Sequence, residues 1–286
     1  MSNPTETFEQ YRPLLFGIAY RMLGSAMEAE DMVQETYLRY QAVAQVESPR
    51  AFLTTVITRL CLDQLKSAKV KREDYFGTWL PEPIHTDDAP AQLVGNLESL
   101  SIAFLVILEQ LSPVERAVFL LREVFDYEYA EISRMVNKEE ATCRQIFSRA
   151  RRHIHASRPR FESTPEEHNQ IFGQFLTAIQ GGDLSGLMTL LADDVASYSD
   201  GGGKRSAATR TVIGAERVAS LLLGLVKRAA GEYTMEIQEV NGRLALIVYQ
   251  NETGLPFTVF NFDISNGKVQ AIQAILNPDK LKQFER

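Results

Sequence analysis

The sequence has 286 residues, enough for two or three domains, and its 45% hydrophobic content favours globular folding over disorder. A net charge of −7 argues against a protein that coats nucleic acid indiscriminately. The two cysteines, Cys61 and Cys143, fall on apolar helix faces, so we expect small buried residues rather than a disulfide or a metal pair. The N-terminus has no long apolar run, which predicts no signal peptide, no membrane span and a cytoplasmic location.

Two amphipathic helices are predicted first along the chain. One covers Phe8 to Leu23 and ends at Gly24, and Ser25 can cap the next, Met27 to Tyr40. The second helix has an apolar face and a polar face. The apolar face is predicted to hold Met32, Val33, Tyr37 and Leu38, and the polar face includes Asp31, Gln34 and Glu35.

A third helix, Arg50 to Ser67, begins after Ser48 and Pro49 and runs into a basic cluster. The cluster consists of Lys66, Lys69, Lys71 and Arg72. Small hydrogen-bonding and charged groups are expected along the exposed side of this helix, at Thr54, Thr55, Thr58, Arg59 and Asp63.

An acidic segment follows, because residues 73–98 hold six acids and no lysine or arginine. Pro81, Pro83 and Pro90 disfavour a regular helix here. The segment Trp79-Leu80-Pro81-Glu82-Pro83 contains the only tryptophan of the chain, whose large apolar area favours burial. We therefore predict that this segment docks on another surface; an ordinary disordered linker is the alternative.

The stretch from Tyr127 to His155 predicts two short helices around a turn at Asn137 and Lys138, after helices at Leu97 to Leu111 and Val114 to Val124. The second of the two short helices exposes a basic and amide-rich face, formed by Arg144, Gln145, Ser148, Arg149, Arg151 and Arg152. Guanidinium and amide groups on one helix face suit base edges in the DNA major groove, and the positive charge suits phosphates. A solvated basic helix in a bundle is the alternative for this stretch alone.

Two longer runs carry a family resemblance. YRPLLFGIAYRMLGSAMEAEDMVQETYLRY with SPRAFLTTVITRLCLDQLK resembles region 2 of a sigma-70 family factor of the extracytoplasmic-function type. LSPVERAVFLLREVFDYEYAEISRMVNKEEATCRQIFSRARRHI resembles region 4 of the same family. The resemblance implies a helical bundle in residues 1–75, a linker in 76–97, a helix-turn-helix domain in 98–156, and binding to core RNA polymerase and promoter DNA.

Site roles follow from this resemblance. Asp31, Gln34 and Glu35 would contact the clamp helices of the largest core subunit, and region 4 would contact the flap of the second-largest subunit. The helix at residues 52–66 and the loop before it would separate the DNA strands at the minus-ten element and hold the unpaired strand. The implied DNA contacts there are Arg50, Thr58, Arg59, Lys66, Lys69, Lys71 and Arg72. Thr142 to Arg152 would read the minus-thirty-five element through Arg144, Gln145, Ser148, Arg149 and Arg152. Phe52 and Arg59 stand where many relatives carry Trp and Asn, which leaves the base preference open.

After a linker at 157–165, residues 166–286 follow a different pattern. Helices at His168 to Gln180, Leu184 to Ala192 and Ala215 to Arg228 precede four alternating runs, which predicts an α+β fold with an antiparallel meander. The runs are Tyr233 to Val240, Arg243 to Tyr249, Phe257 to Ile264 and Lys268 to Ile275. The opening of this part resembles the SnoaL-like members of the NTF2 superfamily, which implies a curved sheet around a cone-shaped pocket.

Three short motifs together resemble the sigma subgroup with a fused SnoaL-like domain. They are Trp79 to Pro83, the loop Asp200-Gly201-Gly202-Gly203-Lys204, and Asn277-Pro278-Asp279-Lys280 followed by Leu281. We predict that these motifs form a regulatory contact between the C-terminal domain and the sigma half. We expect Asp200 to cap the amides of its own glycine loop.

The sequence therefore predicts a sigma factor with a built-in regulatory domain, without a metal, a cofactor or a chemical step of its own. The only histidine of the last domain, His168, is expected at the surface rather than as a catalytic base. The cone that the resemblance implies is the place where a small unidentified ligand would bind. Two alternatives stay open: a one-component helix-turn-helix regulator with a ligand-sensing domain, and a polyketide-cyclase-like enzyme with an accessory DNA module.

Overall fold

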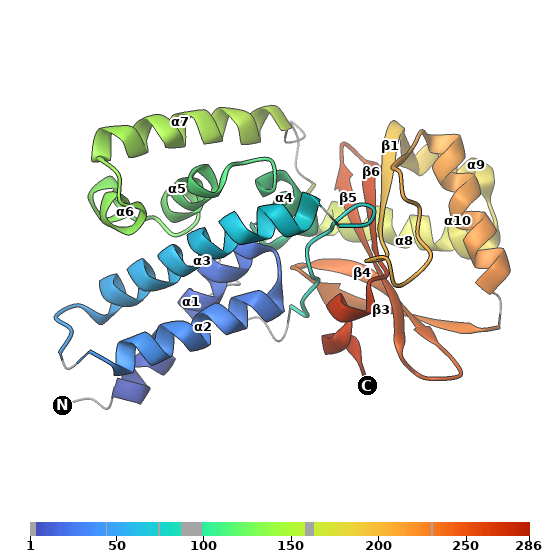
Figure 1. Cartoon of the computed structure of the whole chain (residues 1–286). Helices are drawn as coiled ribbons and strands as arrows, with labels where there is room; N and C mark the ends of the chain where they lie inside the picture. Colours follow the sequence, from blue (N-terminus) through green and yellow to red (C-terminus); the bar gives the residue numbers. More distant parts are fainter. Residues whose placement is uncertain (1–3, 44, 74, 87–98, 158–162, 230) are drawn as a thin grey trace. The chain divides into compact units, whose positions relative to one another are not determined.

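The computed structural model describes residues 4–43, 45–73, 75–86, 99–157, 163–229 and 231–286 (Figure 1). The chain packs as two compact units. The first combines Met1–Asp74 with Ala89–Arg158, and the second combines Tyr75–Asp88 with Pro159–Arg286. The tryptophan-bearing part of the linker is therefore packed into the C-terminal unit.

The first unit begins with helices α1 (Pro4–Leu23), α2 (Ala26–Gln41) and α3 (Pro49–Glu73). Gly24 takes a φ of 69°, and the Ser25 side chain accepts a hydrogen bond from the Glu28 amide at 3.3 Å, so the chain turns and α2 starts there. The expectation that Leu38 points inward is wrong, because its side chain is 59% exposed. Val33, Thr36 and Tyr40, spaced three and four apart, form the buried face instead.

In the described part of this unit four more helices follow: α4 (Ile102–Leu108), α5 (Pro113–Glu123), α6 (Tyr129–Val136) and α7 (Glu140–Ser157). Helix α4 begins at Ile102, later than the start of the predicted 97–111 helix, because Ser101 caps it by accepting from the Phe104 amide at 3.2 Å. Ser112 and Glu115 form a capping box that starts α5. Asn137 ends α6 with a φ of 52°, which makes the predicted turn of the helix-turn-helix.

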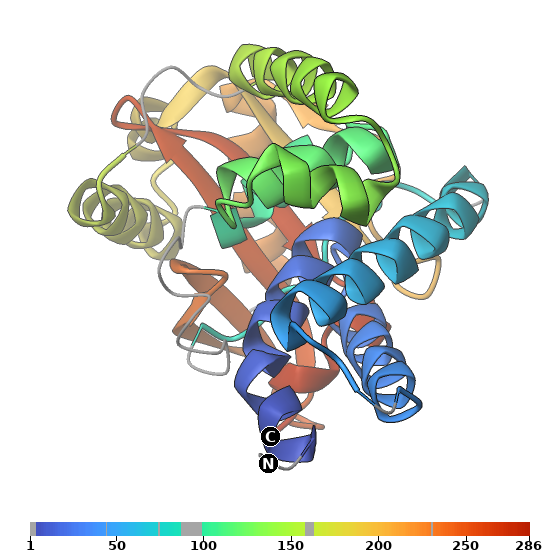
Figure 2. The same ribbon diagram turned by 90° about the vertical axis from the view of Figure 1, so that its left-hand side faces the viewer.

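Helix α3 lies between α1 and α2 on one side and α5 and α6 on the other (Figures 1 and 2). Buried side chains of α3 therefore contact both halves of the unit. Leu53, Ile57 and Cys61 are fully buried along it. This packing has consequences for the predicted DNA contacts described below.

The second unit contains helices α8 (Pro165–Gly181), α9 (Leu184–Leu190) and α10 (Ala215–Ala229) and one six-stranded sheet. The strands are β1 (Leu191–Asp200), β2 (Val212–Ile213), β3 (Tyr233–Val240), β4 (Arg243–Gln250), β5 (Pro256–Ser265) and β6 (Lys268–Ile275). The sheet order is β2-β1-β6-β5-β4-β3, so the four predicted runs form the expected antiparallel meander. Strand β1 pairs in parallel with β6, which alternation alone does not predict.

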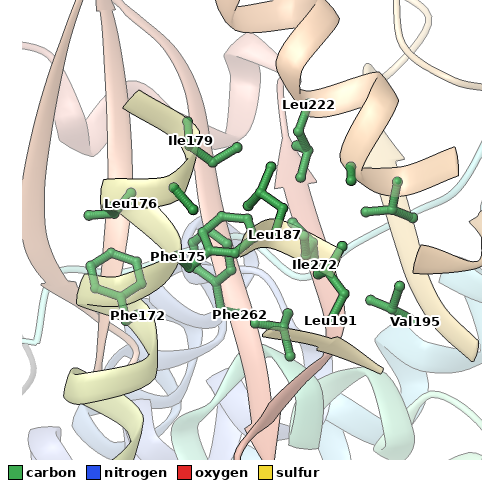
Figure 3. Close-up of a cluster of buried hydrophobic side chains, with 14 of the residues drawn as sticks. Phe172, Phe175, Leu176, Ile179, Leu187, Leu191, Val195, Leu222, Phe262 and Ile272 are labelled. Carbon is green, nitrogen blue, oxygen red and sulfur yellow. The ribbon is translucent and has the colours of Figure 1, made fainter. Parts of the chain in front are cut away.

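Irregular pairing interrupts the sheet at three places, in β1 with β6, β4 with β5 and β5 with β6. Such irregularities bend strands and increase their twist, which curves the sheet of this α+β domain. The apolar core lies between this sheet and the helices (Figure 3). There Phe172 and Phe175 of α8 meet Phe262 of β5 edge-on, with ring centroids 5.2 and 5.1 Å away.

His168 is buried, so the expectation that it lies at the surface is wrong. Its side chain is 2% exposed, stacks on Phe172 at a centroid distance of 6.4 Å, and has Nε2 3.3 Å from the carbonyl oxygen of Phe262. Burial lowers the pKa of this imidazole, and the hydrogen bond to Phe262 only partly offsets that effect. The residue is a core histidine at the start of α8 because its ring packs between the helix and the sheet.

Across the described ranges, no helix is long and apolar enough to cross a membrane. The same residues contain no group of three or more His, Cys, Asp or Glu side chains that could hold a metal ion. Cys61 and Cys143 are both free and buried.

Candidate nucleic-acid interface and linker clamp

Helix α7 presents the predicted basic face to solvent. Cys143, Ile146, Ala150 and Ile154 are buried, and the polar residues between Cys143 and Ile154 are exposed. The exposed residues include all five predicted contacts, Arg144, Gln145, Ser148, Arg149 and Arg152. The apolar side of α7 is fixed against its neighbours, so the polar side is a stable surface.

Arg144 is the most constrained of these exposed groups. Its guanidinium pairs with Glu140 one turn earlier and lies 4.6 Å from the ring centroid of Tyr129. Its side chain is nevertheless 58% exposed. An arginine oriented by a carboxylate and an aromatic ring loses less rotamer freedom when it contacts a base, which suits it to bidentate recognition.

The polar face of α3 differs from its prediction. Thr54 and Thr58 were expected on the exposed side, but both are fully buried, because α3 packs against α5 and α6. The Tyr127 and Thr54 hydroxyls lie 3.4 Å apart. Thr58 Oγ1 has no hydrogen-bond partner among the described residues. In this conformation Thr58 is therefore inaccessible to DNA.

Arg50 and Arg59 stay at the surface but are engaged within the first unit. The Arg50 guanidinium lies 5.1 Å from the centroid of the Tyr127 ring, and a hydrogen bond to Tyr127 raises the pKa of Arg50. Arg59 donates to the carbonyl oxygens of Arg134 at 2.8 Å and Met135 at 3.3 Å. These two carbonyls belong to the last turn of α6, where the helix dipole favours a cation.

A groove of about 590 Å³ lies beside Arg59. Asp63 and Lys66 of α3 line one wall, with Lys66 Nζ 2.8 Å from Asp63 Oδ1, and Asn137 and Lys138 line the other. Lys69, Lys71 and Arg72 continue along α3, but their side chains lie outside the described residues. Among the described side chains of α3, Asp63 and Lys66 are exposed here, in addition to Arg50 and Arg59.

The predicted polymerase-binding face lies on α2. Asp31 and Gln34 are exposed, and Glu35 is half-buried and pairs with Arg39 at 3.0 Å. Val33, on the opposite side, is 1% exposed and anchors the helix. Asp31 and Gln34 are thus presented on a rigid helix.

Asp200 is the centre of a polar cluster in the second unit. It ends β1, and its side chain is fully buried. Its carboxylate accepts hydrogen bonds from the Tyr75 hydroxyl at 2.6 Å, the Leu80 amide at 2.9 Å and the Gly202 amide at 3.1 Å. The predicted capping of the glycine loop is present, and the same carboxylate also holds the linker segment.

Lys280 completes this cluster from the 3₁₀ turn Pro278–Lys280. Its ammonium lies 2.7 Å from Asp200 Oδ2 and donates to the Leu80 carbonyl at 2.5 Å. It also lies 4.3 Å from the centroid of the Trp79 ring and 5.3 Å from that of Tyr75. The three motifs that the sequence singled out therefore meet at one buried ion pair, which we call the linker clamp.

Close backbone approach explains two of the three glycines of the loop. A Cβ atom on Gly202, whose φ is 60°, would collide with the Asn277 side chain. A Cβ on Gly201 would collide with the Arg205 carbonyl oxygen. Asn277 also donates from Nδ2 to the Tyr75 hydroxyl at 2.9 Å, so this packing connects the loop to the linker.

A second group of contacts holds the end of the segment. The Ile84 amide donates to Asn241 Oδ1, and the Asn241 amide donates back to the Ile84 carbonyl, both at 2.9 Å. The Thr86 amide donates to the Glu239 carbonyl at 3.0 Å, and Gln283 donates to the Pro83 carbonyl. These contacts extend the edge of the sheet at β3, so residues 84–86 are held like a short added strand.

Sequence reasoning missed Tyr75, Asn241 and Gln283. Asn241 and Gly242 form the turn between two alternating runs, which is a recognisable hairpin signal. That signal predicts the turn and not the partner, because the linker segment lies more than 150 residues earlier in the chain. Tyr75 and Gln283 carry no local signal of their contacts.

Comparison with known proteins assigns the family. Residues 7–70 match the model of sigma-70 region 2, and residues 101–154 match that of sigma-70 region 4. The ECF RNA polymerase sigma factor SigJ of Mycobacterium tuberculosis H37Rv is 38% identical, over 96% of this chain and 91% of SigJ. The chain belongs to the extracytoplasmic-function sigma factors.

Other relatives of this sigma factor agree. The probable ECF RNA polymerase sigma factor SigI of Mycobacterium tuberculosis CDC 1551 is 33% identical, over 95% of this chain and 92% of SigI. The crystal structure of Mycobacterium tuberculosis SigJ matches with a TM-score of 0.80 and 35% identity, and the match covers 98% of each chain. A one-component helix-turn-helix regulator is not favoured, because such a protein would not need the sigma region 2 found here.

Proposed function

We propose that this sigma factor directs core RNA polymerase to promoters and starts transcription there, in the cytoplasm where the polymerase acts. The exposed face of α7 supports this role, because it joins four potential base-reading groups to an apolar face that fixes the helix. Arg144, Gln145, Ser148 and Arg149 would read the upstream element, and Arg152 would contact phosphate.

Region 2 supplies the other half of the function in this proposal. Asp31, Gln34 and Glu35 would dock α2 on the clamp helices of the largest core subunit, and region 4 would contact the flap of the second-largest one. Arg50, Arg59 and Lys66, with Lys69, Lys71 and Arg72, would engage the minus-ten element. Thr58 would join them only in a conformation in which α3 separates from α5 and α6, since it is buried here.

The C-terminal domain would regulate through the linker clamp rather than by catalysis. The observation that carries this role is the buried Lys280–Asp200 pair, which bonds both the amide and the carbonyl of Leu80. Residues 75–88 connect the two sigma regions along the chain, so holding them restricts how those regions can separate. Clamped and released states would then have different affinities for polymerase, and a partner could shift their populations.

Multi-round transcription in vitro with core polymerase tests both parts of this proposal. The full chain should produce transcripts from a subset of promoters in a random library, and core alone should not. Absence of any promoter-dependent transcript would contradict the sigma role. If the sigma role holds, Lys280→Met should change transcript yield, whereas Lys204→Met should not, because Lys204 pairs with Asp279 at the surface. Equal yields from both variants would contradict regulation through the clamp.

A further inference from the structure

The second unit contains an apolar cavity of about 310 Å³ that belongs to neither the linker clamp nor the sigma domains. Its walls come from α8, α10 and the strands β3, β4 and β5. Leu176, Ile179, Leu222 and Phe262 are lining residues that lie in the core view (Figure 3). Its volume is at the lower end of the range of small-molecule sites, about 300 to 1,000 Å³.

The lining has few polar side chains. Of the eighteen described residues that line the cavity, four carry a polar side-chain atom: Arg228, Glu232, Tyr233 and Thr258. Arg228 and Glu232 are exposed, and so are Leu225 at 43% and Met235 at 37%. These exposed residues form the rim, so the cavity opens to solvent between α10 and β3.

Thr258 differs from the other polar lining residues because it is only 2% exposed. Thr258, Phe260 and Phe262 alternate along β5 and therefore face the cavity together. The Thr258 Oγ1 atom has no hydrogen-bond partner among the described residues. A buried hydroxyl without a partner is unfavourable, and Val would fill the same space without that penalty.

We propose that this cavity binds a small, mostly hydrocarbon molecule that carries one hydroxyl or carbonyl oxygen, and that Thr258 Oγ1 hydrogen-bonds to that oxygen. The aromatic and aliphatic walls would bury the hydrocarbon part. A charged ligand is disfavoured, because no lining side chain deep in the described cavity could pair with a buried charge. Since that wall also has no buried acid or base, the site fits binding and not acid–base catalysis. This inference holds whether or not the linker clamp regulates transcription.

The test uses the full-length protein and the neutral apolar dye N-phenyl-1-naphthylamine, whose fluorescence rises in an apolar site. We expect saturable binding at one site per chain. Competition with 2-naphthol and naphthalene, a pair that differs by one hydroxyl, measures recognition of the oxygen. In the wild type 2-naphthol should displace the dye at about three- to tenfold lower concentration than naphthalene, after each concentration is corrected for the partition of the compound into octanol.

Two variants locate the site. Thr258→Val removes only the hydroxyl and should abolish the preference for 2-naphthol while dye binding is kept. Val226→Phe narrows the cavity and should weaken dye binding at least tenfold. Met188→Ala is the control, because Met188 is 41% exposed on α9 and does not line the cavity. Circular dichroism checks that each variant is folded.

Four results would overturn the proposal. An oxygen preference that persists in Thr258→Val would contradict the role of this hydroxyl. Dye binding that Val226→Phe leaves unchanged, or no saturable binding by the wild type, would contradict the cavity as a ligand site. The last result is a wild-type dimer in sedimentation that binds no dye, together with a Met235→Glu variant that is monomeric and binds the dye. It would show that a second copy of the chain covers the rim instead.

Discussion

Replacing Lys280 with Met tests the linker clamp at its buried ion pair. The Lys280 side chain is 10% exposed and that of Asp200 is fully buried, so the substitution leaves the Asp200 carboxylate buried without its cation. Removing one partner of a buried pair destabilises a protein by about 3–5 kcal/mol. Here the remaining donors, the Tyr75 hydroxyl and the Leu80 and Gly202 amides, still stabilise the carboxylate, so we expect about 3 kcal/mol.

Urea unfolding of the C-terminal unit measures this change, and Trp79 provides a local signal. Trp79 is the only tryptophan of the chain, and its ring lies 4.3 Å from the Lys280 ammonium. In Lys280→Met its emission should shift to the red and its quenching by iodide should increase, because the segment that carries it is held less tightly.

The matched control is Lys204→Met. Lys204 pairs with Asp279 at 2.6 Å, but both side chains are about half exposed, at 54% and 47%. Exposed pairs contribute about 0–1 kcal/mol, so this variant should unfold nearly as the wild type does, with an unchanged Trp79 spectrum. If the two lysine variants lost the same free energy of unfolding to within about 0.5 kcal/mol, the clamp would not be what holds the segment.

Further predictions concern DNA, polymerase and pH. Arg144→Ala should lose about 1–3 kcal/mol of discrimination for the upstream element; equal losses on matched and scrambled DNA in a binding assay would make Arg144 a phosphate contact. Asp31→Arg combined with Glu35→Arg should abolish association with core polymerase while folding is kept, and unchanged assembly in size-exclusion chromatography would contradict that docking face. Burial lowers the folded-state pKa of His168 below its ordinary 6.5, so its contribution to stability is complete above pH 6.5 and is lost as the pH falls through the folded value. His168→Phe should therefore unfold with a weaker pH dependence below pH 6.5, as measured by urea midpoints, and an identical profile would exclude His168 as the cause.

Local patterns in the sequence predicted most elements of this fold. The period of apolar residues placed α2, α5, α6, α7 and the strands β3 to β6 close to their observed bounds, because each element must bury one face. The same periodicity placed Arg144 and Arg149 on the exposed side of α7. The short motifs at Trp79, Asp200 and Asn277 marked segments whose composition did not fit ordinary loops.

Only the tertiary structure decided which of these segments meet and which polar groups are covered. Thr58 has the same local pattern as an exposed helix residue, and it is buried because α5 and α6 pack on that side of α3. His168 is buried for a similar reason, under β5. The ion pair of Asp200 with Lys280 joins residues 80 positions apart in the sequence, and the hydrogen bond between Tyr75 and Asn277 joins residues 202 positions apart. Periodicity is a property of neighbouring residues along the chain, whereas burial and pairing over such separations depend on how complete elements pack together.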